Sequence, residues 1–99
     1  MSYTIMFRRK ALIDYDEARD WYHEKSPDLK IRFEKAISEG LKKVALHPKA
    51  YSPRFDDVRI MPLKKFPYII CYRVDDTNQI ATVIAVWHQA RDRDPLQRR

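Results

Sequence analysis

Ninety-nine residues leave room for one domain, and a hydrophobic share of 44% is enough to build a core. Twenty Lys and Arg against 14 Asp and Glu give a net charge of +6, which favours an anionic partner such as nucleic acid or an acidic protein. The chain has one cysteine, Cys71, which excludes an internal disulfide and a cysteine-based zinc site. It has one glycine, Gly40, which excludes a glycine-rich phosphate loop.

The chain has no apolar stretch of about 18 residues, so no membrane span is expected. At the N-terminus the charges of Arg8 and Arg9 follow the apolar residues, an order that is not typical of a signal peptide. The expected compartment is therefore the cytoplasm, and neither a cofactor nor a metal is expected.

The N-terminal half predicts one strand and two helices. Alternating apolar residues indicate a strand at 3–8. The apolar period then becomes helical and predicts a helix at 11–25, with the acidic residues on the faces away from the core. Pro27 suits the first turn of a second helix at 27–47. The short break between the helices predicts an antiparallel hairpin.

The C-terminal half changes to a period of two and predicts a three-stranded antiparallel meander. Its strands are expected at 58–62, 66–74 and 80–88, and a basic tail follows at 89–99. The predicted class is α+β, a single domain over residues 1–99 with the helices packed on one face of the sheet. The other face has three possible covers: the tail, a partner or solvent.

The order and spacing of several short motifs resemble the RelE/ParE toxin superfamily of type II toxin–antitoxin modules, over nearly the whole chain. The motifs are ARDWY at 18–22, HPKAY at 47–51, VR at 58–59, FPYIICYRV at 66–74 and VIAVWHQARDRDP at 83–95. The resemblance implies a compact α+β toxin and two alternative activities. RelE-like members are ribosome-dependent mRNA endonucleases, whereas ParE-like members inhibit DNA gyrase without nuclease activity.

The nuclease alternative needs an acid, a base and cations around a phosphate. His88, Arg59 and Arg91 are the residues available for it. The match to the nucleases is incomplete: Ile69 stands where they carry a catalytic Arg, and no tyrosine follows Tyr72. The chain is therefore closer to ParE-like members, and no catalytic residue is expected.

The favoured hypothesis is a ParE-like toxin that poisons DNA gyrase, and a non-toxic member that only binds antitoxin is a further alternative. Every alternative predicts a cognate antitoxin, which is expected to be acidic because this chain is basic. Operator DNA is expected to be bound only through the antitoxin. An alternative role for Arg91 is to pair with Asp94 and fasten the tail. Candidate target contacts are Arg91, Arg93, Arg98 and Arg99, and candidate phosphate or partner contacts are Lys64, Lys65 and Arg73.

Overall fold

A computed structural model describes residues 2–99, and its elements follow the predicted order with one extra strand and a short C-terminal helix. The strands and helices are β1 (Thr4–Phe7), α1 (Arg9–Lys25), α2 (Pro27–Leu46), β2 (Pro53–Phe55), β3 (Val58–Pro62), β4 (Tyr68–Asp75), β5 (Ile80–His88) and the 3₁₀ helix η1 (Asp94–Arg98).

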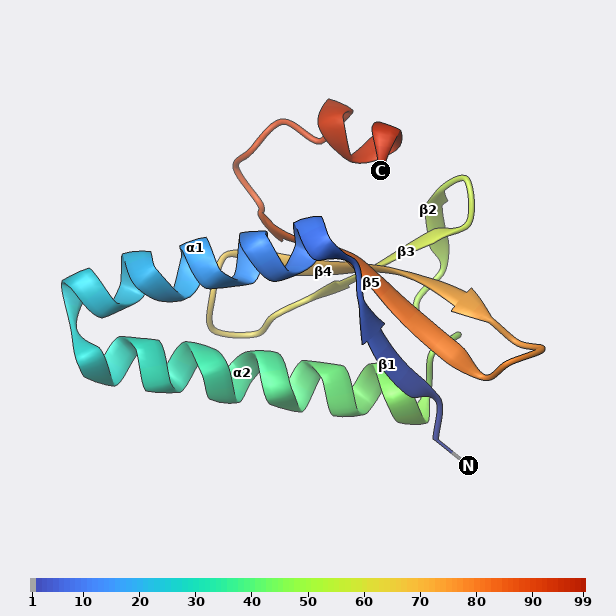
Figure 1. The fold of residues 1–99 in the computed structure, drawn as a ribbon, viewed down its shortest axis with the longest axis horizontal. Helices are drawn as coiled ribbons and strands as arrows, with labels where there is room; N and C mark the ends of the chain where they lie inside the picture. The colour runs from blue at the N-terminus through green and yellow to red at the C-terminus, as the bar shows by residue number, and fades with distance from the viewer. Residues whose placement is uncertain (1) are drawn as a thin grey trace.

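The five strands form one mixed sheet in the order β1-β5-β4-β3-β2. β3, β4 and β5 make the predicted antiparallel meander, and β1 pairs in parallel with β5 from Thr4 opposite Ile80 to Phe7 opposite Val83. A parallel pair needs a long connection, and here the chain between β1 and β5 contains the helical hairpin of α1 and α2 and the strands β2, β3 and β4 (Figure 1). The α+β class is confirmed.

The first face of the sheet packs against the hairpin. Phe33 of α2 is fully buried, and its ring lies 4.9 Å from that of Tyr22 and 5.2 Å from that of Tyr68. Gly40 lets α2 approach the sheet closely, since a Cβ there would lie 2.5 Å from Cε of Met61. This face therefore holds the larger hydrophobic core.

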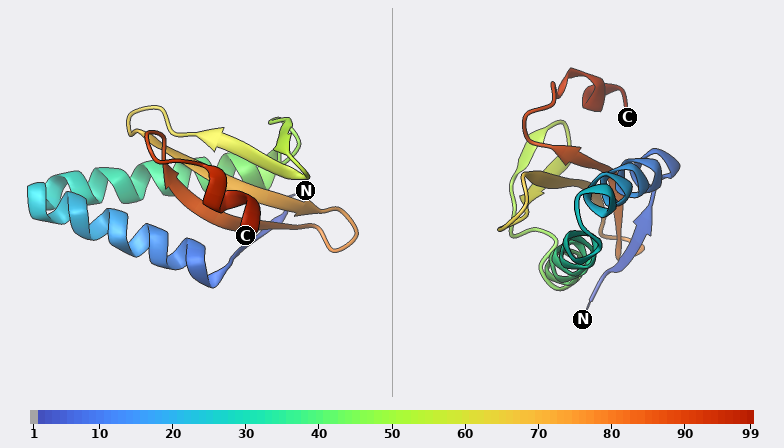
Figure 2. Two further views of the ribbon diagram at one scale, coloured as in Figure 1. Left: turned by 90° about the horizontal axis from the view of Figure 1, so that it is seen from above. Right: turned by 90° about the vertical axis from the view of Figure 1, so that its left-hand side faces the viewer.

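The second face is covered by the C-terminal tail, which passes back over β5 (Figure 2). Leu96 of η1 is fully buried in a cluster with Trp87, Cys71 and Ile84. The Trp87 indole N–H donates to the carbonyl oxygens of Arg91 and Asp92, which holds the turn after β5. Of the three possible covers, the structure has the tail.

Several predicted boundaries were wrong. The helix at 11–25 begins two residues earlier, at Arg9, the strand at 3–8 is shorter, and the helix at 27–47 ends at Leu46. The strand predicted at 66–74 runs from Tyr68 to Asp75, because Pro67 has no N–H to donate to the sheet. β2 was not predicted, because three residues that begin with proline carry no periodic signal.

Candidate functional site

The residues proposed for a nuclease lie at opposite ends of the sheet. Arg59 on β3 is opposite Tyr72, Tyr72 is opposite Val83, and His88 lies five residues further along β5. Strand spacings of about 4.8 Å and a rise of about 3.3 Å per residue place Arg59 and His88 roughly 19 Å apart. Arg59 also donates to the Tyr51 carbonyl oxygen at 2.6 Å. The two side chains do not share one phosphate-sized site.

His88 and Arg91 lie instead beside a cleft with aromatic walls at the far end of β5. This aromatic cleft has a volume of about 510 Å³ and is lined by Trp21, Tyr22, Tyr68, His88 and Arg91 together with Asp14, Glu17, Ala18, Pro67 and Val86. Trp21 on α1 is 52% exposed. Exposed Trp, Tyr and Arg are the residues that most often dominate protein–protein binding energy.

The polar groups of the aromatic cleft are held by local contacts. His88 Nδ1 accepts a hydrogen bond from the backbone N–H of Ala90 at 3.0 Å, and the His88 ring packs edge-on against Tyr68. Partial burial raises the pKa of the Tyr68 hydroxyl, which therefore stays protonated. The Arg91 guanidinium lies 3.6 Å from the centre of the Trp87 ring. Arg91 thus stacks on Trp87, and the alternative pair with Asp94 does not form among residues 2–99.

Arg99 is bound inside the molecule by a carboxylate of α1. Its guanidinium pairs with both oxygens of Asp14 at 2.5 and 3.2 Å and also donates to the Ile84 carbonyl oxygen. The same carboxylate accepts the backbone N–H of Val86. These contacts provide hydrogen-bond partners for the backbone N–H of Val86 and the carbonyl oxygen of Ile84, at the edge of β5 just beyond the point where β1 ends. They leave Arg99 little freedom to contact a target.

The remaining candidates are spread over separate surfaces. Arg93 and Arg98 are exposed on the tail. Arg73 pairs with Asp57 at 2.8 Å and reaches the Arg99 carbonyl oxygen at 3.5 Å. Lys64 and Lys65 lie in the connection between β3 and β4, beside α2.

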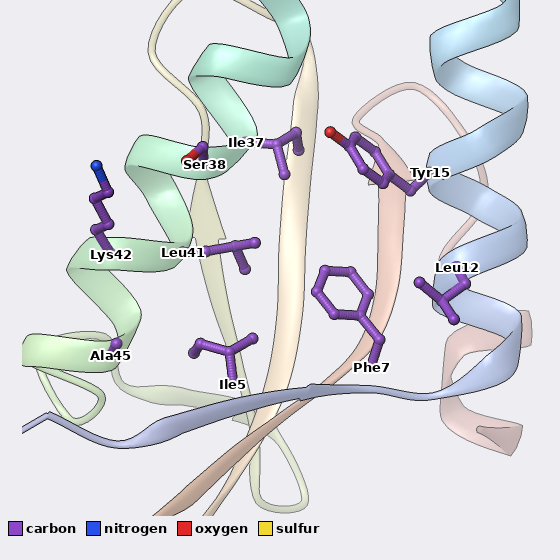
Figure 3. A pocket seen from close by; sticks show the side chains of 9 residues that line it. All are labelled: Ile5, Phe7, Leu12, Tyr15, Ile37, Ser38, Leu41, Lys42 and Ala45. Carbon is purple, nitrogen blue, oxygen red and sulfur yellow. The ribbon is translucent and has the colours of Figure 1, made fainter.

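An apolar groove lies between the helical hairpin and β1. Figure 3 shows Leu12 and Tyr15 of α1, Ile37 and Leu41 of α2, and β1 side chains directed toward one another around it. This hairpin groove has a volume of about 360 Å³, and its lining also includes Ile5, Phe7, Ser38, Lys42 and Ala45. β1 is an edge strand, so one side of its backbone is unpaired by the sheet.

Sequence reasoning missed Asp14, Trp21 and the hairpin groove. The acidic residues of the first helix were all assigned to outer faces, but Asp14 is 9% exposed and lies on the buried face. Its spacing from Ala11 and Ala18, three and four residues, is the signal that could have placed it there. No comparable signal marks Trp21, because residues at the distant end of β5 complete the cleft that it lines.

Two further properties concern cofactors and membranes. Within residues 2–99, no group of three or more His, Cys, Asp or Glu side chains is placed to hold a metal ion. No described helix combines the length and the apolar character needed to cross a bilayer.

The helical hairpin on one face of a five-stranded mixed sheet, with the C-terminal tail on the other, defines a small α+β domain. The chain matches, over residues 5–93, the model of the ParE toxin of the type II toxin–antitoxin system parDE. It therefore belongs to the ParE toxin family, within the RelE/ParE superfamily. Among curated proteins, none matches the chain significantly.

Solved structures show the same fold. The chromosomal ParDE toxin–antitoxin system of P. aeruginosa contains a chain with a TM-score of 0.75 and 19% identity, which covers 88% of this chain and 96% of that one. The RelBE2 complex of Mycobacterium tuberculosis gives 0.59 and 17%, with 89% and 99% covered. The E. coli RelBE complex gives 0.55 and 21%, with 91% and 100% covered.

Proposed function

We propose that this toxin acts in the manner of the ParE-like members: it binds DNA gyrase, poisons it on cleaved DNA, and is neutralised by a cognate acidic antitoxin. The observation that carries the proposal is the separation of Arg59 from His88 by roughly 19 Å along the strands and across the sheet. General acid–base catalysis needs its groups within hydrogen-bonding reach of one substrate. The separation supports action by binding over action by catalysis.

The target contact is proposed for the aromatic cleft and the adjacent tail. Trp21 and Arg91 are both exposed and line the same cleft. Arg93 is exposed two residues further along the tail. Arg99 has no part in this contact, because its guanidinium is bound to Asp14 and to the carbonyl oxygen of Ile84.

The antitoxin contact is proposed for the hairpin groove. The RelBE2 structure of Mycobacterium tuberculosis and the RelBE structure of E. coli, which have this fold, are toxin–antitoxin complexes, and this supports an antitoxin as partner. Leu12 is 46% exposed at the rim of the groove, and Ile5 and Phe7 of the edge strand also line it. An amphipathic antitoxin helix buries such a groove with its apolar face.

A gyrase supercoiling and DNA-cleavage assay with the purified chain tests the target. Inhibition with accumulation of cleaved DNA is expected, and Trp21→Ala with Arg91→Ala is expected to weaken it at least tenfold. Exposed Arg54, on β2, provides the matched control Arg54→Ala. Cleavage of ribosome-bound mRNA by the wild-type chain, with gyrase unaffected, would replace the proposal by the RelE-like alternative.

The hairpin groove is tested by antitoxin affinity. Leu12→Asp places a charge at the apolar rim and is expected to weaken antitoxin binding at least tenfold, measured by titration calorimetry. Ile13→Asp is the control, because Ile13 is equally exposed at 46% but does not line the groove. Equal losses for both variants would show that the groove is not the antitoxin site.

A further inference from the structure

A second groove runs along the opposite side of α2, between that helix and the connection from β3 to β4. It has a volume of about 430 Å³. We call it the cationic groove; its rim carries Arg32, Lys35, Lys43, Lys64 and Lys65 with Glu39, and its floor is formed by Ala36, Gly40, Tyr51, Met61, Pro62, Leu63 and Phe66.

Among the described residues, one of the five cations on this rim forms an ion pair, and the other four do not. Arg32 pairs with Asp28 at 2.9 Å. Among the described residues, Lys35, Lys43, Lys64 and Lys65 form no ion pair, and all four are exposed. The fields of neighbouring charges add where the charges lie within about a Debye length, ~10 Å at 0.1 M salt, and such a cluster attracts an anionic ligand.

The floor of the groove distinguishes between two kinds of anion. A nucleic-acid backbone is bound mainly by cations and polar groups that contact phosphate. The floor here is apolar, with Met61, Leu63 and Phe66 beneath the lysines. An acidic peptide that carries an apolar side chain uses both parts: its carboxylates contact the rim and its apolar side chain covers the floor. The observations favour the peptide.

We propose that the cationic groove binds an acidic segment of the antitoxin, continuous with the helix that occupies the hairpin groove. This inference rests on the proposed function, since its occupant is the antitoxin. The two grooves lie on opposite sides of α2, with Ile37 and Leu41 lining one and Ala36 and Gly40 the other. A helix is about 10–12 Å across, so about five extended residues at ~3.3 Å each lead from one groove to the other.

An exposed apolar side chain lies on α2 outside both grooves. Ile31 on the outer surface of the helix is 63% exposed, the highest value among the large hydrophobic residues of the described chain. A single antitoxin segment would therefore bury an apolar groove, cross α2 and end in a cationic groove. Its acidic part adds both affinity and a faster association.

Charge reversal at the groove is the principal test. Lys64→Glu with Lys65→Glu lowers the net charge by four, and Lys25→Glu with Arg54→Glu is the matched control at exposed positions outside the groove. The probe is a fluorescein-labelled synthetic peptide of repeated Glu-Glu-Leu, followed by anisotropy at two salt concentrations. The groove variant is expected to bind at least tenfold more weakly than wild type, and the control within threefold.

A serine-containing peptide, an oligonucleotide and a variant with a filled groove test whether the ligand is an acidic peptide with apolar side chains or a nucleic acid. Replacing Leu by Ser in the peptide, and Ala36→Trp in the protein, are each expected to weaken binding at least fivefold without a change in the charge of the partner. The proposal is overturned if the serine peptide binds as well as the leucine peptide. It is also overturned if a DNA or RNA oligonucleotide of equal charge binds more tightly and depends on Lys64 and Lys65, because the groove then serves nucleic acid.

Cell growth tests whether the occupant is the antitoxin. The double variant at Lys64 and Lys65 is expected to remain toxic but to need more antitoxin, co-expressed from the adjacent reading frame, for growth to be restored. Loss of toxicity would assign the groove to the target and overturn the proposal. If the wild-type chain is not toxic, the proposed function fails, and the affinity of the purified antitoxin for the two double variants still decides the role of the groove.

Discussion

The two faces of the sheet are closed by very different means. The hairpin face is covered by two long helices and contains a cluster of aromatic rings around Phe33. The tail face is covered by a short segment that inserts one large side chain, Leu96. An ion pair between Arg99 of this segment and Asp14 of α1 holds its end. The first cover stabilises the fold through many apolar contacts, whereas the second depends on a few residues.

This difference predicts distinct responses to substitution. The loss of one side chain on the hairpin face lowers the stability of the whole domain. The loss of one contact on the tail face also releases the tail locally, because few other contacts hold it. Since the tail carries Arg91 and Arg93, such release would also change the proposed target surface.

The largest effect is expected for Phe33→Ala. Phe33 is fully buried against Tyr22, Phe66 and Tyr68, and truncation of a buried Phe costs about 3–5 kcal/mol. The free energy of unfolding, measured in urea, should fall by about 4 kcal/mol, and Phe33→Leu should lose less than half as much. Equal unfolding midpoints for wild type and Phe33→Ala would contradict the assignment of the main core to this face.

The next effect is expected for Asp14→Ala. It leaves the largely buried guanidinium of Arg99 and the N–H of Val86 without their acceptor, and removal of one partner of a buried pair costs about 3–5 kcal/mol. We expect a loss of about 3 kcal/mol in the free energy of unfolding. The double variant with Arg99→Met should recover part of it, whereas an additive loss would show that the pair is not coupled.

A smaller global effect, with a clear local signal, is expected for Leu96→Ala. Burial raises the pKa of the Cys71 thiol to about 12, so the native thiol is protonated and inert at pH 8. Removal of the Leu96 side chain should lower stability by about 2 kcal/mol and speed the labelling of Cys71 by a thiol reagent at least tenfold. Gln97→Ala, at an exposed neighbour, should leave the labelling rate unchanged.

An effect that is absent at neutral pH is expected from alkaline titration, and it compares two neighbours on β4. Burial raises the pKa of Cys71, on the tail face, from 9.0 to about 12, and that of Tyr72, on the hairpin face, from 10.0 to about 12. Both raised values mean that the unfolded chain loses its protons first, so stability is full below pH 9 and falls as the pH rises toward 12. Cys71→Ala should shift the onset of this loss to near pH 10, and an unchanged onset would contradict it.

The sequence was sufficient for the elements that carry a long periodic signal. The two helices and β5 were predicted because apolar residues recur over many turns or fill a whole strand. The meander and the α+β class followed from their order. β2 could not be predicted, since three residues are too few for a period, and the start of β4 was misplaced by two residues at Pro67.

The candidate site was predicted far less completely than the fold. The sequence named His88, Arg59 and Arg91 together, but strand register alone decides that Arg59 lies across the sheet from the other two. Arg99 was grouped with the exposed tail arginines, and only the packing of α1 against β5 brings Asp14 to it. Such pairs join residues that are far apart in the chain, so no local pattern reports them.

By itself the sequence determined the order of the elements, the basic charge and the toxin superfamily. The tertiary structure decided which side chains meet: the tail covers the second face, Arg99 is bound to Asp14, and grooves of opposite character, one apolar and one cationic, lie on the two sides of α2. The physical reason is that periodicity records which face of an element is buried. It does not record which distant element covers that face.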